Sequence, residues 1–155
     1  KGVIYFGLML TESGPRVVEY NARFGDPETQ PILSMLDTDL MDIFQACVDG
    51  TLDQVDIRWK EGAACCLVLA SGGYPVKYQS GYPISGLEEA EALGAVVFHA
   101  GTKKAEKGGF VTAGGRVLGV TARGASLREA VEKSYAAAKP ISFQDMHFRT
   151  DIGKV

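Results

Sequence analysis

Apolar and polar positions at the start of the chain predict a hairpin followed by a short helix. Residues 3–10 and 16–21 are two short apolar runs on either side of a turn that contains glycine and proline. Two such runs around a short glycine-containing loop are typical of a β-hairpin. After the hairpin, Asp26 is expected to be the N-cap of a helix whose first residue is Pro27. The backbone N–H at the first position of a helix has no partner within the helix, so the missing N–H of proline costs nothing there.

A second helix is expected to begin at Thr38 or Asp39 and to end at Gly50, a glycine at the position where helices commonly stop. Its apolar residues recur at intervals of three and four, and therefore share one helical face. These residues are Leu40, Ile43, Phe44, Cys47 and Val48.

The second half of the chain is richer in strand patterns. Apolar runs predict strands at residues 63–70, 96–100, 110–112 and 116–122. The strands at 96–100 and 110–112 are expected to pair with each other across a Lys-rich turn. Two helices complete the picture: residues 87–93, stopped by Gly94, and a helix that opens with a capping box at residues 126–129 and ends before Pro140. The predicted fold class is α+β in two pieces.

Charge divides the chain in the same region. Residues 1–57 carry 3 basic and 10 acidic side chains, whereas residues 58–155 carry 13 basic and 9 acidic ones. This shift predicts two domains, residues 1–57 and 58–155. The net charge of −3 argues against nucleic acid as the main partner. The longest apolar stretch, residues 63–70, is far too short to span a membrane.

The cysteines suggest no covalent or metal framework. Cys65 and Cys66 are adjacent, and Cys47 stands alone. Zinc sites need spaced cysteines with further ligands, and the sequence has no such spacing. Buried thiols in a reducing compartment are the favoured interpretation.

The most specific candidate chemistry lies at the end of the second hairpin strand. Glu19 and Asn21 are separated by one residue, so in a strand they share a face while Tyr20 lies on the other. A carboxylate and an amide oxygen are hard ligands that suit Mg²⁺, whose shell is completed by water and phosphates. The competing interpretation is a solvated strand end with no metal.

Three charged residues follow within ten positions. Arg23 carries a guanidinium group, which binds carboxylate or phosphate through paired hydrogen bonds. Asp26 and Glu28 stand at the expected helix start, where capping and a favourable first-turn charge are structural alternatives to a role in binding. The proximity of metal-type ligands, a cation and a helix start favours a functional site.

A second candidate lies in the other half of the chain. Gly114 and Gly115 would let a ligand approach the backbone closely, and Arg116 could then hold a phosphate. A tight turn beside a surface arginine is the structural alternative. His99 is interpreted as a packed histidine, with a general-base role as the less favoured alternative.

The chain also resembles a known family. Residues 14–30, which include the run from Glu19 to Arg23 and the segment from Gly25 to Glu28, look like the signature of the phosphoribosylamine–glycine ligases, also called glycinamide ribonucleotide synthetases. Four later stretches agree in order and spacing: residues 69–75, 97–102, 114–118 and 149–153. The resemblance covers essentially the whole chain, but only the last third or so of such an enzyme.

The resemblance implies the end of an ATP-grasp domain followed by a small β-rich, barrel-sandwich-like carboxy-terminal lobe. It implies an ATP-dependent ligase of de novo purine biosynthesis in the cytoplasm. In such an enzyme ATP phosphorylates the glycine carboxylate, and the amine of 5-phosphoribosylamine attacks the acyl phosphate. The products are glycinamide ribonucleotide, ADP and phosphate.

The resemblance also assigns roles to individual residues. Glu19 and Asn21 match the family's ligands for Mg²⁺ or Mn²⁺, and Arg23 matches an arginine that would hold glycine or the acyl phosphate. Asp26 and Glu28 would line the substrate pocket. In the carboxy-terminal lobe, Arg116 resembles a position that related ligases use for a ribose phosphate.

Two features depart from the family pattern. Many ATP-grasp proteins carry a metal-binding carboxylate on the strand before the metal ligands, where this chain has Tyr5. The ATP-binding front half of the enzyme is also absent from this chain. The expected partner of the chain is therefore the amino-terminal part of the same enzyme, and the chain alone is expected to be inactive. The alternative from another class is a non-catalytic ribose-phosphate-binding or docking module; a biotin or lipoyl carrier is disfavoured, because Lys103 and Lys104 lack flanking methionines.

Overall fold

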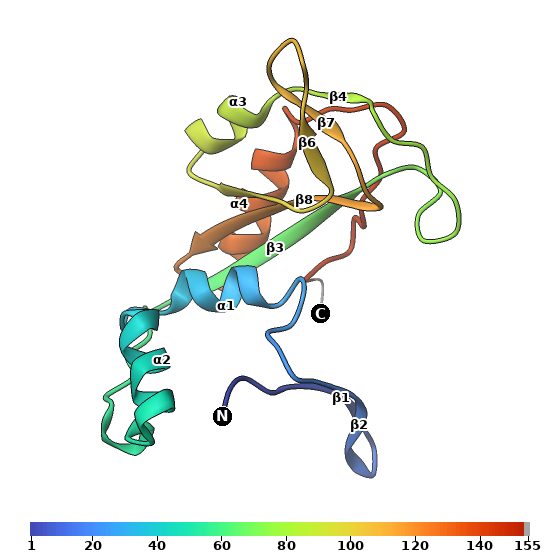
Figure 1. The fold of residues 1–155 in the computed structure, drawn as a ribbon. Coiled ribbons are helices and arrows are strands. Elements are labelled where there is room, and N and C mark those ends of the chain that lie inside the picture. The colour runs from blue at the N-terminus through green and yellow to red at the C-terminus, as the bar shows by residue number, and fades with distance from the viewer. Residues whose placement is uncertain (154–155) are drawn as a thin grey trace. The chain divides into compact units, whose positions relative to one another are not determined.

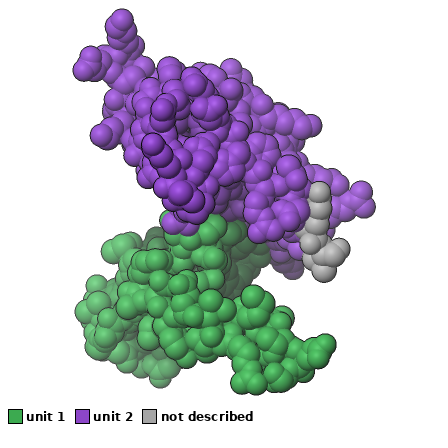
Figure 2. Space-filling model, turned by 90° about the vertical axis from the view of Figure 1, so that its right-hand side faces the viewer, with its two compact units in different colours: residues 1–60 green, residues 61–155 purple. Residues whose placement is uncertain are grey.

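The computed structural model describes residues 1–153 and divides the chain into two compact units. Unit 1 is Lys1–Lys60 and unit 2 is Glu61–Val155. Figure 1 shows the order of the helices and strands, and Figure 2 colours the two units separately.

Unit 1 opens with the predicted hairpin. Strands β1 (Tyr5–Thr11) and β2 (Gly14–Asn21) pair antiparallel. Tyr5 lies opposite Asn21 and Phe6 opposite Tyr20, and a β-bulge shifts the register after Gly7. This pairing confirms the predicted hairpin. The sequence could predict it because the two apolar runs and the glycine-containing turn between them lie within one short stretch.

Two helices follow the hairpin: α1 (Thr29–Met35) and α2 (Leu40–Asp49), before a single 3₁₀ turn, η1 (Leu52–Gln54). The Asp39 side chain accepts a hydrogen bond of 2.8 Å from the Met41 N–H and so caps α2. Gly50 has a φ of 80°, the left-handed conformation that ends a helix at low cost in glycine. Both predicted ends of α2 are confirmed.

The prediction that Asp26 caps the first helix is wrong. Residues 26–28 form a turn, the Asp26–Pro27 peptide bond is cis, and the residue that precedes α1 is Glu28. The Thr29 N–H donates to the Gly25 carbonyl at 3.2 Å. An aspartate before a proline suits a tight turn as well as a helix start, and here the turn comes first.

Unit 2 contains two three-stranded antiparallel sheets. The first has the order β3-β8-β5 and the second the order β4-β7-β6. The strands are β3 (Ala63–Ala70), β4 (Pro83–Ile84), β5 (Val96–His99), β6 (Thr102–Lys104), β7 (Phe110–Thr112) and β8 (Arg116–Gly124). The predicted pairing of β5 with β7 is wrong: β5 pairs with β8, and the turn is closed by β6, which pairs with β7.

Two helices complete unit 2: α3 (Leu87–Ala92) and α4 (Leu127–Ala138). The predicted capping box of α4 is present. The Ser126 hydroxyl accepts from the Glu129 N–H at 3.3 Å, and Glu129 Oε2 accepts from the Ala125 N–H at 2.7 Å. Two N–H groups at the helix start are thereby satisfied.

The apolar core belongs to unit 2. Helix α4 packs on β3 and β8, and core residues such as Leu69 and Val117 are fully buried. In unit 1, within the part of the chain that the structure describes, Ala46 is the only buried residue with a hydrophobic side chain. The α+β class is confirmed. No helix among residues 1–153 is both long enough and apolar enough to cross a membrane.

Candidate active site

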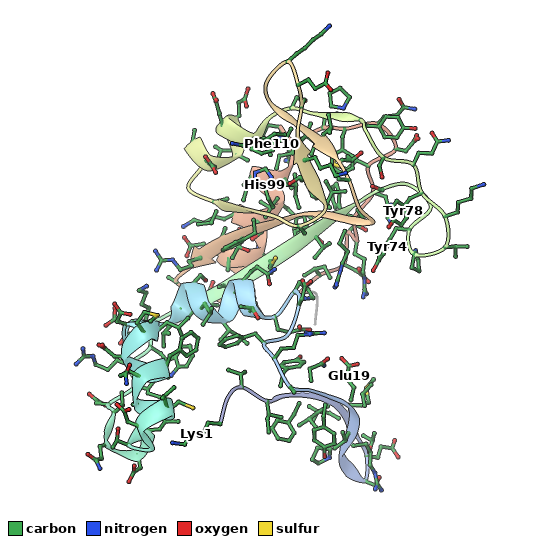
Figure 3. All side chains as sticks on the ribbon, viewed as in Figure 1. Lys1, Glu19, Tyr74, Tyr78, His99 and Phe110 are labelled. Carbon is green, nitrogen blue, oxygen red and sulfur yellow. The ribbon has the colours of Figure 1, made fainter. Side chains whose placement is uncertain are left out.

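Glu19 and Asn21 lie side by side at the end of β2. The Asn21 side-chain nitrogen donates to Glu19 Oε1 at 3.0 Å. Glu19, which is labelled in Figure 3, is exposed. Gly7 lies opposite Glu19 on β1, and a Cβ there would come within 3.1 Å of Glu19 Cγ. The strand spacing thus brings the two predicted side chains together, with a glycine leaving room for the glutamate.

Tyr5 and Glu28 extend this cluster. Tyr5 lies opposite Asn21. Desolvation raises the pKa of the Tyr5 phenol, as do the charge of Glu28, a hydrogen bond to Glu28 and the charge of Glu19. A Cβ at Gly25 would lie 2.5 Å from Glu28 Oε2 and 3.2 Å from the Tyr5 ring, so glycine lets this carboxylate sit against the phenol.

Arg23 and Asp26 lie in the segment that connects the hairpin to α1. Arg23 is exposed, and its Nη1 donates to the Phe24 carbonyl at 2.7 Å. Asp26 is exposed in the turn before α1. The structure therefore groups Glu19, Asn21 and Glu28 around Tyr5, and leaves Arg23 and Asp26 at the surface of the same unit.

A divalent metal ion would be held by few protein ligands here. Among residues 1–153 no group of three or more His, Cys, Asp and Glu side chains is arranged to hold a metal. Glu19 and Asn21 fit a hard divalent ion because they are adjacent, accessible and carry oxygen donors. An ion held by two protein ligands takes its remaining oxygens from water and phosphates.

Arg116 lies in unit 2, at the start of β8 and opposite Ala70. The preceding glycine is explained by packing within the unit: a Cβ at Gly115 would lie 2.1 Å from the Tyr74 ring. Likewise, a Cβ at Gly114 would lie 3.0 Å from the Gly101 Cα. Close packing therefore accounts for the two glycines without a ligand.

His99 packs at the surface of unit 2. Its ring centroid is 4.3 Å from that of Phe110, and its Nδ1 lies 2.9 Å from the Thr102 hydroxyl (Figure 3). The residue is exposed, but both its ring face and one ring nitrogen have partners. These contacts fit a packed histidine better than a general base.

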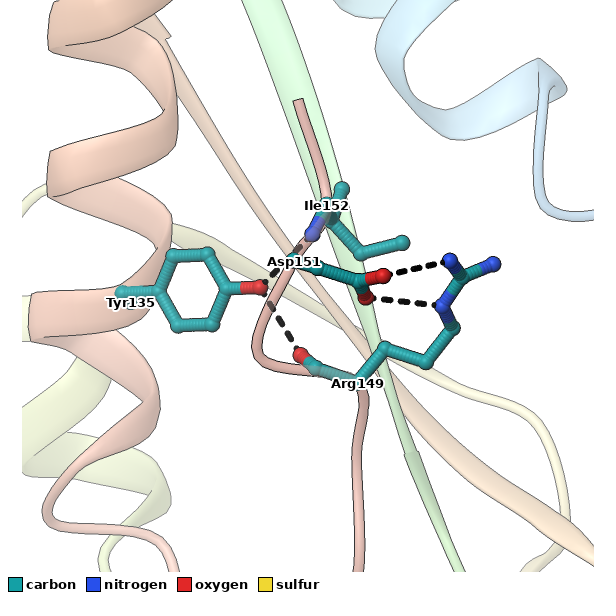
Figure 4. Close-up of polar contacts among 4 residues, drawn as sticks. All are labelled: Tyr135, Arg149, Asp151 and Ile152. Atoms are coloured by element: carbon teal, nitrogen blue, oxygen red, sulfur yellow. Dashed lines mark hydrogen bonds and ion pairs between the residues drawn. The ribbon is translucent and has the colours of Figure 1, made fainter. Parts of the chain in front are cut away.

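One polar cluster was not singled out from the sequence. Arg149 binds Asp151 through two hydrogen bonds, Nε to Oδ1 at 2.9 Å and Nη2 to Oδ2 at 2.8 Å. The Tyr135 hydroxyl donates to the Arg149 carbonyl at 2.8 Å and accepts from the Ile152 N–H at 3.1 Å (Figure 4). Arg149 and Asp151 are two positions apart, so the sequence could have indicated that they pair. The contact of Tyr135 on α4 with their segment joins distant residues and had no signal in the sequence.

Two family models match the chain. Residues 1–29 match "Phosphoribosylglycinamide synthetase, ATP-grasp (A) domain", and residues 64–155 match "Phosphoribosylglycinamide synthetase, C domain". The chain thus combines part of an ATP-grasp domain with a β-rich carboxy-terminal domain, and the expected fold class is confirmed. The class defined by this combination is the ATP-grasp proteins.

The chain belongs to the phosphoribosylglycinamide synthetase family, which confirms the resemblance read from its motifs. It is 49% identical over 152 residues to a phosphoribosylamine–glycine ligase from Caldanaerobacter subterraneus subsp. tengcongensis, a match that covers 98% of this chain and 36% of the relative. A ligase of the same name from Vibrio parahaemolyticus is 50% identical over 153 residues, with 98% and 35% covered.

A solved structure agrees. The crystal structure of phosphoribosylamine–glycine ligase from Thermotoga maritima superposes with a TM-score of 0.74 at 32% identity. The match covers 96% of this chain and 36% of that one. The chain therefore spans about a third of the length of the relatives that it matches.

Proposed function

We propose that this chain supplies the carboxy-terminal part of a phosphoribosylamine–glycine ligase, a cytoplasmic enzyme of purine biosynthesis that joins glycine to 5-phosphoribosylamine at the expense of ATP. Residues 1–57 would complete its ATP-grasp domain, and residues 58–155 would form its carboxy-terminal domain. The observation that carries the proposal is the Glu19–Asn21 pair, held at 3.0 Å on a hairpin of the matched ATP-grasp segment.

In this proposal Glu19 and Asn21 hold Mg²⁺ or Mn²⁺. A bound divalent ion neutralises charge on ATP phosphates. Arg23 would bind a carboxylate or phosphate oxygen of the glycine-derived substrate, because its guanidinium is exposed and offers several N–H donors. Asp26 and Glu28 would line the same pocket, with Glu28 oriented by the Tyr5 phenol.

Arg116 is proposed to bind the ribose phosphate of phosphoribosylamine. It is half-buried at the start of β8. A guanidinium in that position can offer two parallel N–H groups to a phosphate. The packing of Gly115 against Tyr74 would fix the backbone that carries it.

The test uses a chimera in which this chain replaces the matched part of the Caldanaerobacter relative. We expect the chimera to release ADP only when glycine and phosphoribosylamine are both present. Glu19→Gln should lower the rate at limiting Mg²⁺ by about tenfold or more, and excess Mg²⁺ should restore part of it. Glu12→Gln, at the tip of the same hairpin, is the matched control and should leave the Mg²⁺ dependence unchanged.

Two outcomes would contradict the proposal. A folded chimera that releases no ADP with all substrates removes the ligase assignment. An active chimera whose Mg²⁺ dependence is the same with Glu19→Gln removes Glu19 from the metal site. The unfused chain, given the same substrates, is expected to release no ADP above background.

A further inference from the structure

The backbone that carries Glu28 is fixed by hydrogen bonds on both sides of that residue. The Thr29 N–H and the Thr29 hydroxyl both donate to the Gly25 carbonyl, the N–H at 3.2 Å, and so close the turn that contains Glu28. The Glu28 carbonyl accepts from the Ile32 N–H at 3.2 Å. The Glu28 side chain therefore leaves the backbone at a defined point, and its contacts decide where its carboxylate lies.

Gly25 provides the space for that carboxylate. Gly25 is buried, and its backbone lies outside the left-handed region, so alanine would be accepted there if there were room. A Cβ at this position would lie 2.5 Å from Glu28 Oε2, 3.1 Å from Glu28 Cβ and 3.2 Å from the Tyr5 ring. The lack of a side chain at Gly25 thus lets the Glu28 carboxylate and the Tyr5 phenol approach each other.

The two carboxylates around Tyr5 have different hydrogen-bond donors. The Glu19 carboxylate accepts from the Asn21 side chain at 3.0 Å. The Tyr5 phenol is hydrogen-bonded to Glu28, whereas Glu19 acts on the phenol through its charge. A phenol has one O–H to donate, so Tyr5 occupies one acceptor position of the Glu28 carboxylate and leaves the other positions for a ligand.

A carboxylate that is held in this way binds hydrogen-bond donors. Ionised Glu28 only accepts hydrogen bonds, whereas the guanidinium of Arg23, in the segment before it, only donates them. The two residues therefore suit different groups of a substrate: Arg23 a carboxylate or phosphate, and Glu28 an amino group. We propose that Tyr5 is a positioning residue, which holds the Glu28 carboxylate in the orientation in which it accepts hydrogen bonds from the amino group of a substrate. This inference rests on the proposed function, in which glycine and 5-phosphoribosylamine each carry an amino group.

The experiment uses the chimera with the Caldanaerobacter relative and measures the KM for glycine, the KM for 5-phosphoribosylamine and the half-saturating Mg²⁺ concentration. Tyr5→Phe removes only the phenol hydroxyl. We expect it to raise the KM for one of the two amino substrates by about fivefold or more, since a hydrogen bond to a charged group is lost, and to leave the half-saturating Mg²⁺ concentration unchanged. The substrate whose KM rises identifies the amino group that Glu28 binds.

Tyr20→Phe is the matched control for the loss of a phenol hydroxyl. Tyr20 lies on the same hairpin, next to Asn21 in the chain, and faces the opposite side because side chains alternate along a strand. Tyr20→Phe should leave both KM values within about twofold of wild type.

A double variant separates positioning from support of the fold. Glu28→Gln alone should raise the same KM at least as much as Tyr5→Phe does. Because Tyr5 acts through Glu28, adding Tyr5→Phe to Glu28→Gln should raise that KM little further. Gly25→Ala should also raise it, because the added methyl group displaces the Glu28 carboxylate. Circular dichroism should show that Tyr5→Phe keeps the wild-type fold.

Several results would overturn this inference while leaving the proposed function intact. With an active wild-type chimera, these are unchanged KM values in Tyr5→Phe, an equal rise of the same KM in Tyr20→Phe, and a Tyr5→Phe effect that is as large with Glu28→Gln as without it. Loss of the wild-type fold in Tyr5→Phe would also overturn it, since Tyr5 would then be a structural residue. A wild-type chimera that releases no ADP counts against the proposed function, and the inference falls with it.

Discussion

The contact between Gly115 and Tyr74 gives a quantitative test of why the Gly114–Gly115 pair is present. The Gly115 backbone lies outside the left-handed region, so alanine would be accepted there if space allowed. Its Cβ, however, would lie 2.1 Å and 2.6 Å from two carbons of the Tyr74 ring. Forcing an extra methyl group into such a contact costs about 1–3 kcal/mol.

Gly115→Ala should therefore lower the melting temperature of unit 2 by roughly 4–8 °C per kcal/mol, the shift expected for a domain of this size. The assay is thermal unfolding followed by circular dichroism, within a double-mutant cycle with Tyr74→Ala. Once the ring is removed, Gly115→Ala should cost about 0.5 kcal/mol or less. The reasoning fails if Gly115→Ala is as stable as wild type, or if its cost is the same in the Tyr74→Ala background.

Three further predictions concern α4 and the segment that it holds. Tyr135→Phe removes both hydrogen bonds to residues 149–152, so we expect a loss of about 1 kcal/mol and faster exchange of the Ile152 amide; unchanged exchange would contradict this. Ser126→Ala should cost about 1 kcal/mol in urea unfolding, and an unchanged midpoint would exclude a capping role. Hydrogen bonding to Lys133 lowers the pKa of Glu129 in the folded protein. The charged Glu129 side chain therefore stabilises the fold at neutral pH, and this contribution is lost as the pH falls through the folded pKa. The stability difference between wild type and Glu129→Gln should therefore shrink on acidification, and a constant difference would refute it.

Local patterns predicted the elements that local physics determines. The apolar spacing of α2, its Asp39 cap and the Gly50 stop all depend on residues within one or two helical turns. The capping box of α4 and the hairpin follow from equally short stretches. The shared face of Glu19 and Asn21 belongs to this group, since it needs only the two-residue period of a strand.

Contacts between distant residues were not accessible in the same way. Strand β5 pairs with β8 and not with β7. Both β7 and β8 are apolar enough to pair with β5, so the sequence pattern did not distinguish between them. The packing of Tyr74 on Gly115 joins residues 41 positions apart in the sequence. A glycine pair alone could not distinguish this packing from an approach by a ligand.

The cluster of Tyr5, Glu19 and Glu28 shows how the two kinds of information combine. Strand spacing places Glu19 beside Asn21, but only the turn at residues 26–28 brings the Glu28 carboxylate back to the Tyr5 phenol. At Tyr5, where the family resemblance led us to expect a carboxylate, the chain carries a phenol, and the Glu28 carboxylate interacts with it. The Glu28 carboxylate therefore reaches the Tyr5 phenol from a segment outside the hairpin, a contact that the strand pattern alone does not predict.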